Sequence, residues 1–134
     1  MFRSPTSGSE RGAGAGADMS DFLTQRCNLP GKVAVVLGGA GGIGRAVTLA
    51  LGSAGVDVGF CDTDPEAMAA TLAELRALGR TGFARVLDVT RAAALEEFYA
   101  EVAASFERLD IVVNVVGGVR HPMRWCFWPR IYPG

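Results

Sequence analysis

The chain has 134 residues, 49% hydrophobic and 20% charged, with a formal net charge of −1. These values indicate one globular domain and give no basic field that would attract nucleic acid or an anionic membrane. No apolar run reaches the ~18 residues of a membrane span, no secretory leader is recognisable, and the three cysteines follow no metal-binding or disulfide spacing. We therefore expect a cytoplasmic protein with reduced thiols.

Residues 1–28 predict a flexible N-terminal tail, because the segment up to Asp18 is rich in glycine, alanine and serine. Met19 precedes an ordinary short lead-in to a first strand, and we interpret it as the natural start of the protein. Residues 119–134 predict an atypical C-terminal tail, since they hold both tryptophans and the only histidine and show neither helical nor strand periodicity.

Between these tails, residues 29–118 alternate strand and helix signals. Short apolar runs predict strands at Lys32–Leu37, Val56–Cys61, Phe83–Leu87 and Ile111–Val116. These runs are apolar along most of their length, which is typical of parallel strands that are covered by helices on both faces of the sheet. The order predicts an α/β fold, a three-layer Rossmann-type doubly wound parallel sheet that is truncated after about four strands.

Three helices are expected between the strands. The first, Gly42–Ala54, is predicted to bury a stripe made of Ile43, Val47, Ala50, Leu51 and Ala54. The second begins with Pro65 after an Asp64 cap, ends at Gly79, and is predicted to bury Met68, Leu72 and Leu75. The third is predicted to be capped by Thr90 and to bury Leu95, Phe98, Val102 and Phe106.

Five glycines lie between positions 38 and 44, directly after the first predicted strand and at the start of a helix. Free N–H groups and the positive end of the helix dipole bind anions there, and glycines let a pyrophosphate approach the backbone. Two registers fit, G-x-G-x-x-G through Gly39, Gly41 and Gly44, and G-x-x-x-G-x-G through Gly38, Gly42 and Gly44. Both indicate a dinucleotide site.

Asp62 follows the second predicted strand, 18 residues beyond Gly44. A carboxylate at this place accepts hydrogen bonds from the adenosine ribose hydroxyls and repels a 2′-phosphate. No arginine precedes Arg45 in the loop, and Thr63 rather than a base follows Asp62. These residues favour NAD over NADP as the cofactor.

The register is decided by landmarks in chain order: Gly38-x-x-x-Gly42-Ile43-Gly44, Asp62, "LDVT" at 87–90 and "VNVVGG" at 113–118. Together they resemble the short-chain dehydrogenase/reductase family over residues 29–118. The resemblance implies that Gly38, Gly42, Ile43 and Gly44 surround the pyrophosphate and that Asp62 holds the adenosine ribose. It further implies that Asp88 and Val89 flank the adenine, that Asn114 lies near the nicotinamide-side ribose, and that Gly117 matches the glycine of the same motif.

The chain departs from the family pattern at Leu37, which stands in place of a threonine, and at Val115 and Val116, which replace Asn-Ala. The family also uses a serine and a Tyr-x-x-x-Lys pair for acid–base chemistry. The only lysine here is Lys32, before the first strand, and neither tyrosine has a lysine four residues later. We therefore assign no catalytic residue and no metal ligand.

We interpret the chain as the N-terminal part of such an enzyme, altered near Val119, that binds NAD(H) and lacks the catalytic groups. The parent enzyme would act on a small alcohol or ketone. The alternatives are a genuine short protein and a non-catalytic nucleotide-binding or interaction protein. A different enzyme that uses FAD fits the landmarks at 87–90 and 113–118 poorly. An oligomer is conceivable, but the helices that form the family's usual interface are not in this sequence.

Overall fold

A computed structural model describes residue 22 and residues 26–117, which form a four-stranded parallel sheet in the order β3-β2-β1-β4. The strands are β1 (Val33–Leu37), β2 (Asp57–Asp62), β3 (Gly82–Val86) and β4 (Ile111–Asn114), and the helices are α2 (Gly42–Ser53), α3 (Pro65–Ala77) and α4 (Ala92–Phe106). The predicted doubly wound α/β sheet is confirmed, with strand ends displaced by at most two residues. Most of the predicted N-terminal tail, and the C-terminal tail 119–134, lie outside the described residues.

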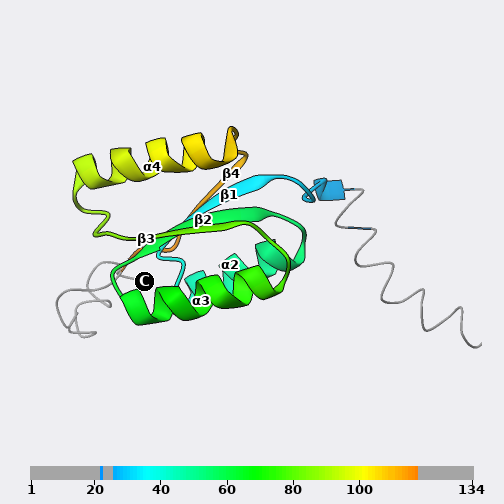
Figure 1. Ribbon diagram of the computed structural model, residues 1–134, viewed down its shortest axis with the longest axis horizontal. Coiled ribbons are helices and arrows are strands. Elements are labelled where there is room, and N and C mark those ends of the chain that lie inside the picture. The colour runs from blue at the N-terminus through cyan, green and yellow to red at the C-terminus, as the bar shows by residue number, and fades with distance from the viewer. Residues whose placement is uncertain (1–21, 23–25, 118–134) are drawn as a thin grey trace, which may run out of the picture.

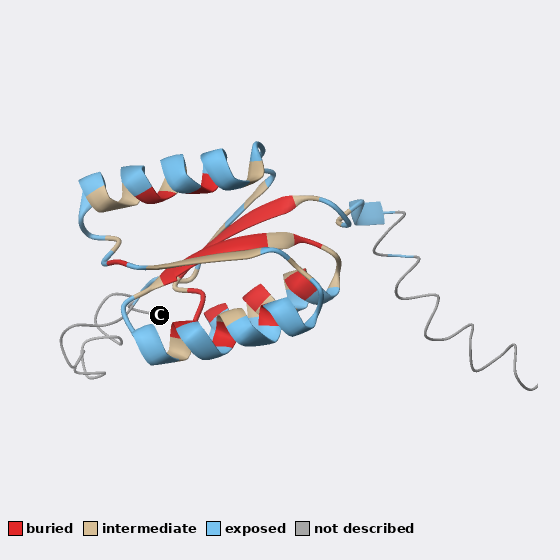
Figure 2. Ribbon diagram, viewed as in Figure 1, coloured by how far each residue is buried: buried red, intermediate tan, exposed pale blue. Residues whose placement is uncertain are grey.

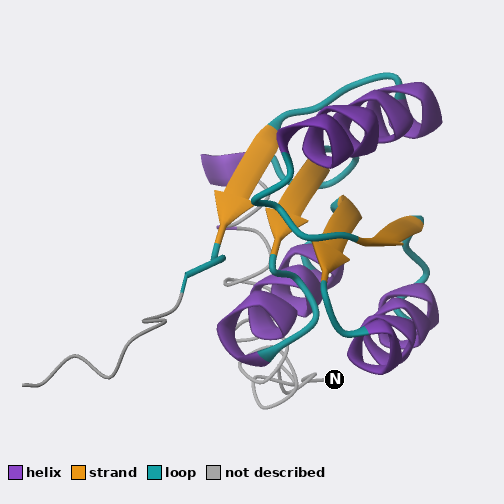
Figure 3. Cartoon of the chain, turned by 90° about the vertical axis from the view of Figure 1, so that its left-hand side faces the viewer, coloured by secondary structure: helices purple, strands orange, loops and turns teal. Residues whose placement is uncertain are grey.

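The sheet is the middle of three layers. Helices α2 and α3 cover one face, and α4 covers the other (Figure 1). Figure 3 views the molecule from the side at which the strands end, with α4 above the sheet and α2 and α3 below it. The carboxyl ends of all four strands therefore meet at one edge, between the helical layers.

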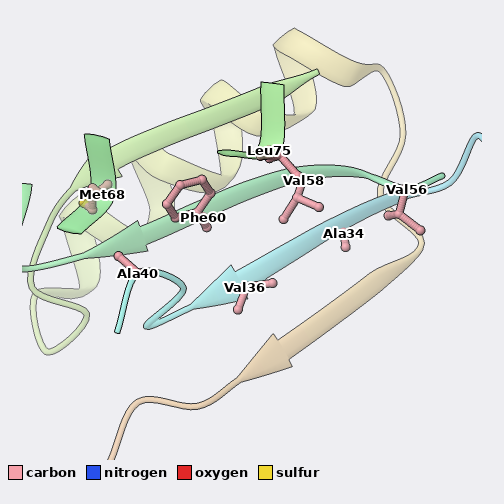
Figure 4. Packing of buried hydrophobic residues seen from close by; sticks show 8 residues of the cluster. All are labelled: Ala34, Val36, Ala40, Val56, Val58, Phe60, Met68 and Leu75. Atoms are coloured by element: carbon pink, nitrogen blue, oxygen red, sulfur yellow. The ribbon is translucent and has the colours of Figure 1, made fainter. Parts of the chain in front are cut away.

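Alternation along the central strand β1 divides the core in two, because successive side chains of a strand point to opposite faces. On the α2 and α3 side lies the cluster shown in Figure 4, made of Ala34, Val36, Ala40, Val56, Val58, Phe60, Met68 and Leu75. On the α4 side lie Val35, Leu37, Cys61, Leu87, Phe98 and Val102. Both faces of β1 and most of β2 are buried (Figure 2), as the continuous apolar runs predicted.

The predicted buried stripe of α2 is partly wrong. Ile43 is 75% exposed, and the residues that α2 buries are Gly44, Thr48 and Gly52. The reason is close packing, since a Cβ at Gly52 would overlap Leu75 Cδ1 of α3. The face of α2 that meets its neighbours therefore carries small residues at its centre, while Val47, Leu49 and Leu51 pack against the core only partly buried.

The two predicted helix caps have different outcomes. The Asp64 cap of α3 is confirmed, because its Oδ1 accepts hydrogen bonds from the N–H groups of Glu66 and Ala67 at 3.0 and 3.1 Å. The Thr90 cap of α4 is wrong, since α4 begins after Arg91 without a side-chain cap. The Thr90 hydroxyl instead donates to Asp88 Oδ1 at 2.7 Å, so it closes a turn before the helix.

β4 ends at Asn114, two residues before the prediction. The Asn114 side-chain oxygen accepts the N–H of Val116 at 3.0 Å, which turns the chain away from the strand direction. Within the described residues, β4 pairs only with β1, and Val112 on it is 53% exposed.

The Asp110 carboxylate joins the starts of β1 and β4. It accepts hydrogen bonds from Arg108 Nε at 2.8 Å, Arg108 Nη2 at 2.7 Å and the Val33 N–H at 2.9 Å. The Arg108 guanidinium, followed by the Val33 N–H, lowers the pKa of Asp110 from 3.8 to about 2. The ionised carboxylate therefore stabilises the folded state, and this contribution disappears as the proton returns.

Asp110→Asn is expected to lower the melting temperature at neutral pH. The pKa of Asp110 is lowered only in the folded state, so the carboxylate stops stabilising that state once it is protonated. The difference in melting temperature between the variant and the unchanged protein should therefore shrink as the pH falls from about 3.8 to about 2. Thermal unfolding followed by circular dichroism measures this difference. Glu96→Gln, on an exposed part of α4, makes the same change of charge and serves as the control. If the difference in melting temperature between the Asp110 variant and the unchanged protein stayed constant across this pH range, the ionised Asp110 would not be the group that stabilises the fold.

None of the helices in the described part of the chain combines the length and apolarity needed to cross a bilayer.

Candidate functional site

The glycine loop between β1 and α2 has a conformation that glycine permits. Gly38 and Gly42 have φ angles of +81° and +49°, in the left-handed region that other residues rarely adopt. Gly44 has a different constraint, because a Cβ there would overlap the carbonyl oxygen of Gly38. The loop thus requires glycine at the three positions of the Gly38/Gly42/Gly44 register.

The first half of the loop is attached to the end of β2. The N–H groups of Gly38 and Gly39 both donate to the carbonyl oxygen of Cys61, at 2.9 and 3.0 Å. Gly39 also lies against Phe60, where a Cβ would come within 2.6 Å of the Phe60 Cβ. From the other side, the buried Thr48 hydroxyl of α2 donates to the Gly39 carbonyl oxygen at 3.1 Å.

The second half of the loop leaves hydrogen-bond donors available. Within residues 26–117, the N–H groups of Gly41, Gly42 and Ile43 donate to no backbone or side-chain acceptor. They stand at the start of α2, where the helix dipole is positive. Three successive free N–H groups at a helix start form a site for an anion such as a pyrophosphate.

Asp62, the last residue of β2, lies beside this loop. Its Oδ2 accepts the N–H of Ala40 at 3.1 Å, and its Oδ1 accepts the N–H of Thr63 at 2.7 Å. An ionised carboxylate has about four acceptor positions. Asp62 therefore keeps the capacity to accept ligand hydroxyls while it holds these two peptide groups.

A cavity of about 510 Å³ runs along the carboxyl edge of the sheet, from the glycine loop to the segment after β4. Of the predicted site residues, it is lined by Gly38, Asp62, Asp88, Val89 and Gly117. The other predicted residues, Gly42, Ile43, Gly44 and Asn114, do not line it. Gly44 is buried under the loop, Ile43 is exposed, and Asn114 binds the Val116 N–H.

The cavity is also lined by residues that sequence reasoning did not select, namely Gly41, Cys61, Thr63, Leu87, Thr90, Val115 and Val116. Nearly all of them stand at or within a few residues after the end of a strand. Ligands of open α/β sheets bind beyond the carboxyl ends of the strands. These lining residues could therefore have been identified from their places after the predicted strands, without any motif.

Cys61 has its thiol in the core between the sheet and α4. Burial, together with the charge of Asp62, raises the pKa of this thiol, although the Gly38 N–H acts in the opposite direction. Burial likewise raises the pKa of the Tyr99 hydroxyl. Both groups are therefore protonated at neutral pH.

A parallel sheet with a glycine loop and a strand-end carboxylate at one cavity beyond its carboxyl ends defines a Rossmann-like α/β domain. A sequence model of the short chain dehydrogenase family matches residues 32–125. The chain therefore belongs to the short chain dehydrogenase family.

Individual relatives agree with this family. The chain is 34% identical to the short chain dehydrogenase/reductase dpfgG of Gibberella zeae, over 72% of this chain and 35% of that protein. It is 37% identical to 2,3-dihydro-2,3-dihydroxybenzoate dehydrogenase of Bacillus subtilis, over 69% of this chain and 34% of that protein. A short chain dehydrogenase from Mycobacterium paratuberculosis, solved with NAD bound, superposes with a TM-score of 0.68 at 28% identity, over 73% of this chain and 41% of that one.

The chain spans between about a third and about half of the length of the first curated relatives that it matches, with values of 35%, 55% and 32%.

Proposed function

We propose that residues 29–118 form the NAD-binding domain of a short-chain oxidoreductase, which as a whole transfers hydride between NAD and an alcohol or ketone. One observation carries the proposal: Asp62 lines the same cavity as Gly41, whose N–H is the first of the three free groups at the start of α2. The donors suit a pyrophosphate, and the carboxylate suits the ribose hydroxyls. The NAD bound to the Mycobacterium paratuberculosis protein supports this choice of ligand.

In this proposal the predicted site residues keep separate roles. Gly38, Gly42, Ile43 and Gly44 shape and surround the pyrophosphate site, and Asp62 accepts the adenosine ribose. Asp88 and Val89, which follow β3, flank the adenine. Asn114, the last residue of β4, lies near the nicotinamide-side ribose, and Gly117 is the glycine of the same motif. When bound, NAD supplies the hydride acceptor, and the residues of this chain bind and orient it.

The charges around the loop favour NAD over NADP. A 2′-phosphate beside the adenosine ribose would face the Asp62 carboxylate. Arg45, the first arginine after the loop, reaches toward α3, where its Nη2 is 2.5 and 2.7 Å from the carboxylate oxygens of Glu74. The nearest cation along the chain is thus paired with another helix.

Titration with NADH and NADPH, followed by cofactor fluorescence, tests the proposal. We expect NADH to saturate the chain below millimolar concentration and NADPH to bind at least about tenfold more weakly, a difference of about 1.4 kcal/mol. No NADH binding at millimolar concentration would contradict the nucleotide site itself. Equal affinities would overturn only the preference for NAD.

We further propose that the 134-residue chain binds its cofactor without turning it over. Its only lysine, Lys32, precedes β1, and neither Tyr99 nor Tyr132 is followed by a lysine four residues later. The Bacillus relative acts on a ring that carries hydroxyl groups, so secondary alcohols are the substrates to try. Production of NADH from NAD and such alcohols, measured by absorbance, would refute this part of the proposal. We expect the protein in the cytoplasm, where NAD is available.

A further inference from the structure

The Asp62 carboxylate makes a contact that ribose binding does not require. Its Oδ2 accepts the N–H of Ala40, a residue 22 positions earlier in the glycine loop, at 3.1 Å. Ala40 is 2% exposed, so water has little access to replace this acceptor. A buried N–H without an acceptor is unfavourable, and the loop would have to turn to satisfy it.

The same peptide group is held at its other end. The Gly39 carbonyl and the Ala40 N–H belong to one peptide unit and point in opposite directions, because the unit is planar and trans. The carbonyl accepts the buried Thr48 hydroxyl of α2 at 3.1 Å, while the N–H donates to Asp62 at the end of β2. This peptide unit is therefore fixed between a helix and a strand.

The orientation of this unit decides which way the following backbone points. With the N–H groups of Gly38, Gly39 and Ala40 all directed to the end of β2, the next three, from Gly41 to Ile43, are the ones that stay free. We propose that Asp62 is a positioning residue for the glycine loop, holding the Ala40 peptide so that the loop presents its free N–H groups to a pyrophosphate. This inference rests on the proposed nucleotide site and gives Asp62 a role besides ribose recognition.

Asp62→Asn separates the two roles. Asparagine has nearly the same shape but only one acceptor oxygen, so it cannot accept both Ala40 and Thr63. The ligands are ADP and 2′,3′-dideoxy-ADP, which keeps the pyrophosphate and lacks both ribose hydroxyls. If Asp62 acted only through those hydroxyls, the variant would bind dideoxy-ADP unchanged, or more tightly because a negative charge beside an anion is gone.

We expect the opposite change in affinity for dideoxy-ADP, measured by calorimetric titration of the full chain. Asp62→Asn should weaken dideoxy-ADP binding roughly tenfold. Thr48→Val, which removes the other bond of the same peptide unit without changing charge, should weaken ADP and dideoxy-ADP to the same degree. Asp64→Asn is the matched control, since it removes the same charge two residues away and asparagine still caps α3. Dideoxy-ADP binding that is unchanged or stronger in Asp62→Asn would overturn the proposal.

A second measurement needs no ligand. In the free protein, we take the ratio of the amide hydrogen exchange rate at Ala40 to the rate at Val36 in β1. A general loss of stability raises both rates and leaves their ratio unchanged. Asp62→Asn should raise this ratio roughly tenfold, and Asp64→Asn should leave it unchanged. An unchanged ratio in Asp62→Asn would overturn the positioning role. A raised ratio in a chain that binds no NADH would reject the proposed function and keep the positioning role.

Discussion

Replacing Gly44 by alanine is expected to remove cofactor binding and to destabilise the fold by about 3 kcal/mol. The added Cβ would overlap the carbonyl oxygen of Gly38 and would also lie 2.8 Å from Val115 Cγ2. The first neighbour is backbone, in a residue whose φ of +81° and hydrogen bond to Cys61 fix its place. The loop cannot yield locally, so it must leave β2 and lose its free N–H groups. Urea denaturation and NADH titration measure the two effects.

Gly41→Ala is the matched control for this prediction. Gly41 has a φ of −121°, which any residue can adopt, and a Cβ there would meet nothing within 4 Å. We expect its stability to stay within about 1 kcal/mol of the unchanged chain, the size of an unfavourable helix N-cap. If Gly41→Ala and Gly44→Ala lowered the stability equally, the close packing at Gly44 would not be what the loop requires.

The order of the sheet elements could be predicted because each depends on local features. The β-branched run before Gly38 and the Asp64-Pro65 pair before α3 indicate a strand and a helix start without reference to the rest of the chain. The parallel arrangement then follows from the alternation of strands and helices. The landmarks from Gly38 to Gly117 gave the family for the same reason, since each is a short motif at the end of a strand.

The face of α2 could not be predicted from hydrophobic spacing. That spacing selects Ile43 for the core, but the contacts with the glycine loop and with α3 are so close that Gly44 and Gly52 occupy them. Hydrophobic periodicity finds large buried side chains and does not detect a face made of small ones. The contact between Asp62 and Ala40 was missed for a related reason, because a single hydrogen bond between residues 22 positions apart has no sequence pattern.

The other face of the sheet leads to the second large prediction. Among the described helices only α4 covers it, and the residues that α4 buries are Phe98 and Val102. Phe98 is fully buried and stacks on Phe83 of β3, with ring centroids 6.0 Å apart. Phe98→Ala is expected to cost about 3–5 kcal/mol, a large part of the roughly 5–15 kcal/mol that stabilises a domain. Urea denaturation followed by circular dichroism measures the loss.

Phe106→Ala is the control on the same helix. Because Phe106 is only partly buried, its replacement should lower the free energy of unfolding clearly less than Phe98→Ala does. Phe98 shares its cluster with Cys61 and Leu87, which line the cavity at the carboxyl edge of the sheet, but Phe98 itself does not line that cavity. Its variant should therefore still bind NADH when folded. A ligand at about 100 times its Kd stabilises the folded state by about 2.7 kcal/mol, so saturating NADH should restore much of what Phe98→Ala loses. It should restore nothing in Gly44→Ala, whose loop no longer binds. The same response to NADH in both variants would contradict this separation of the core from the glycine loop.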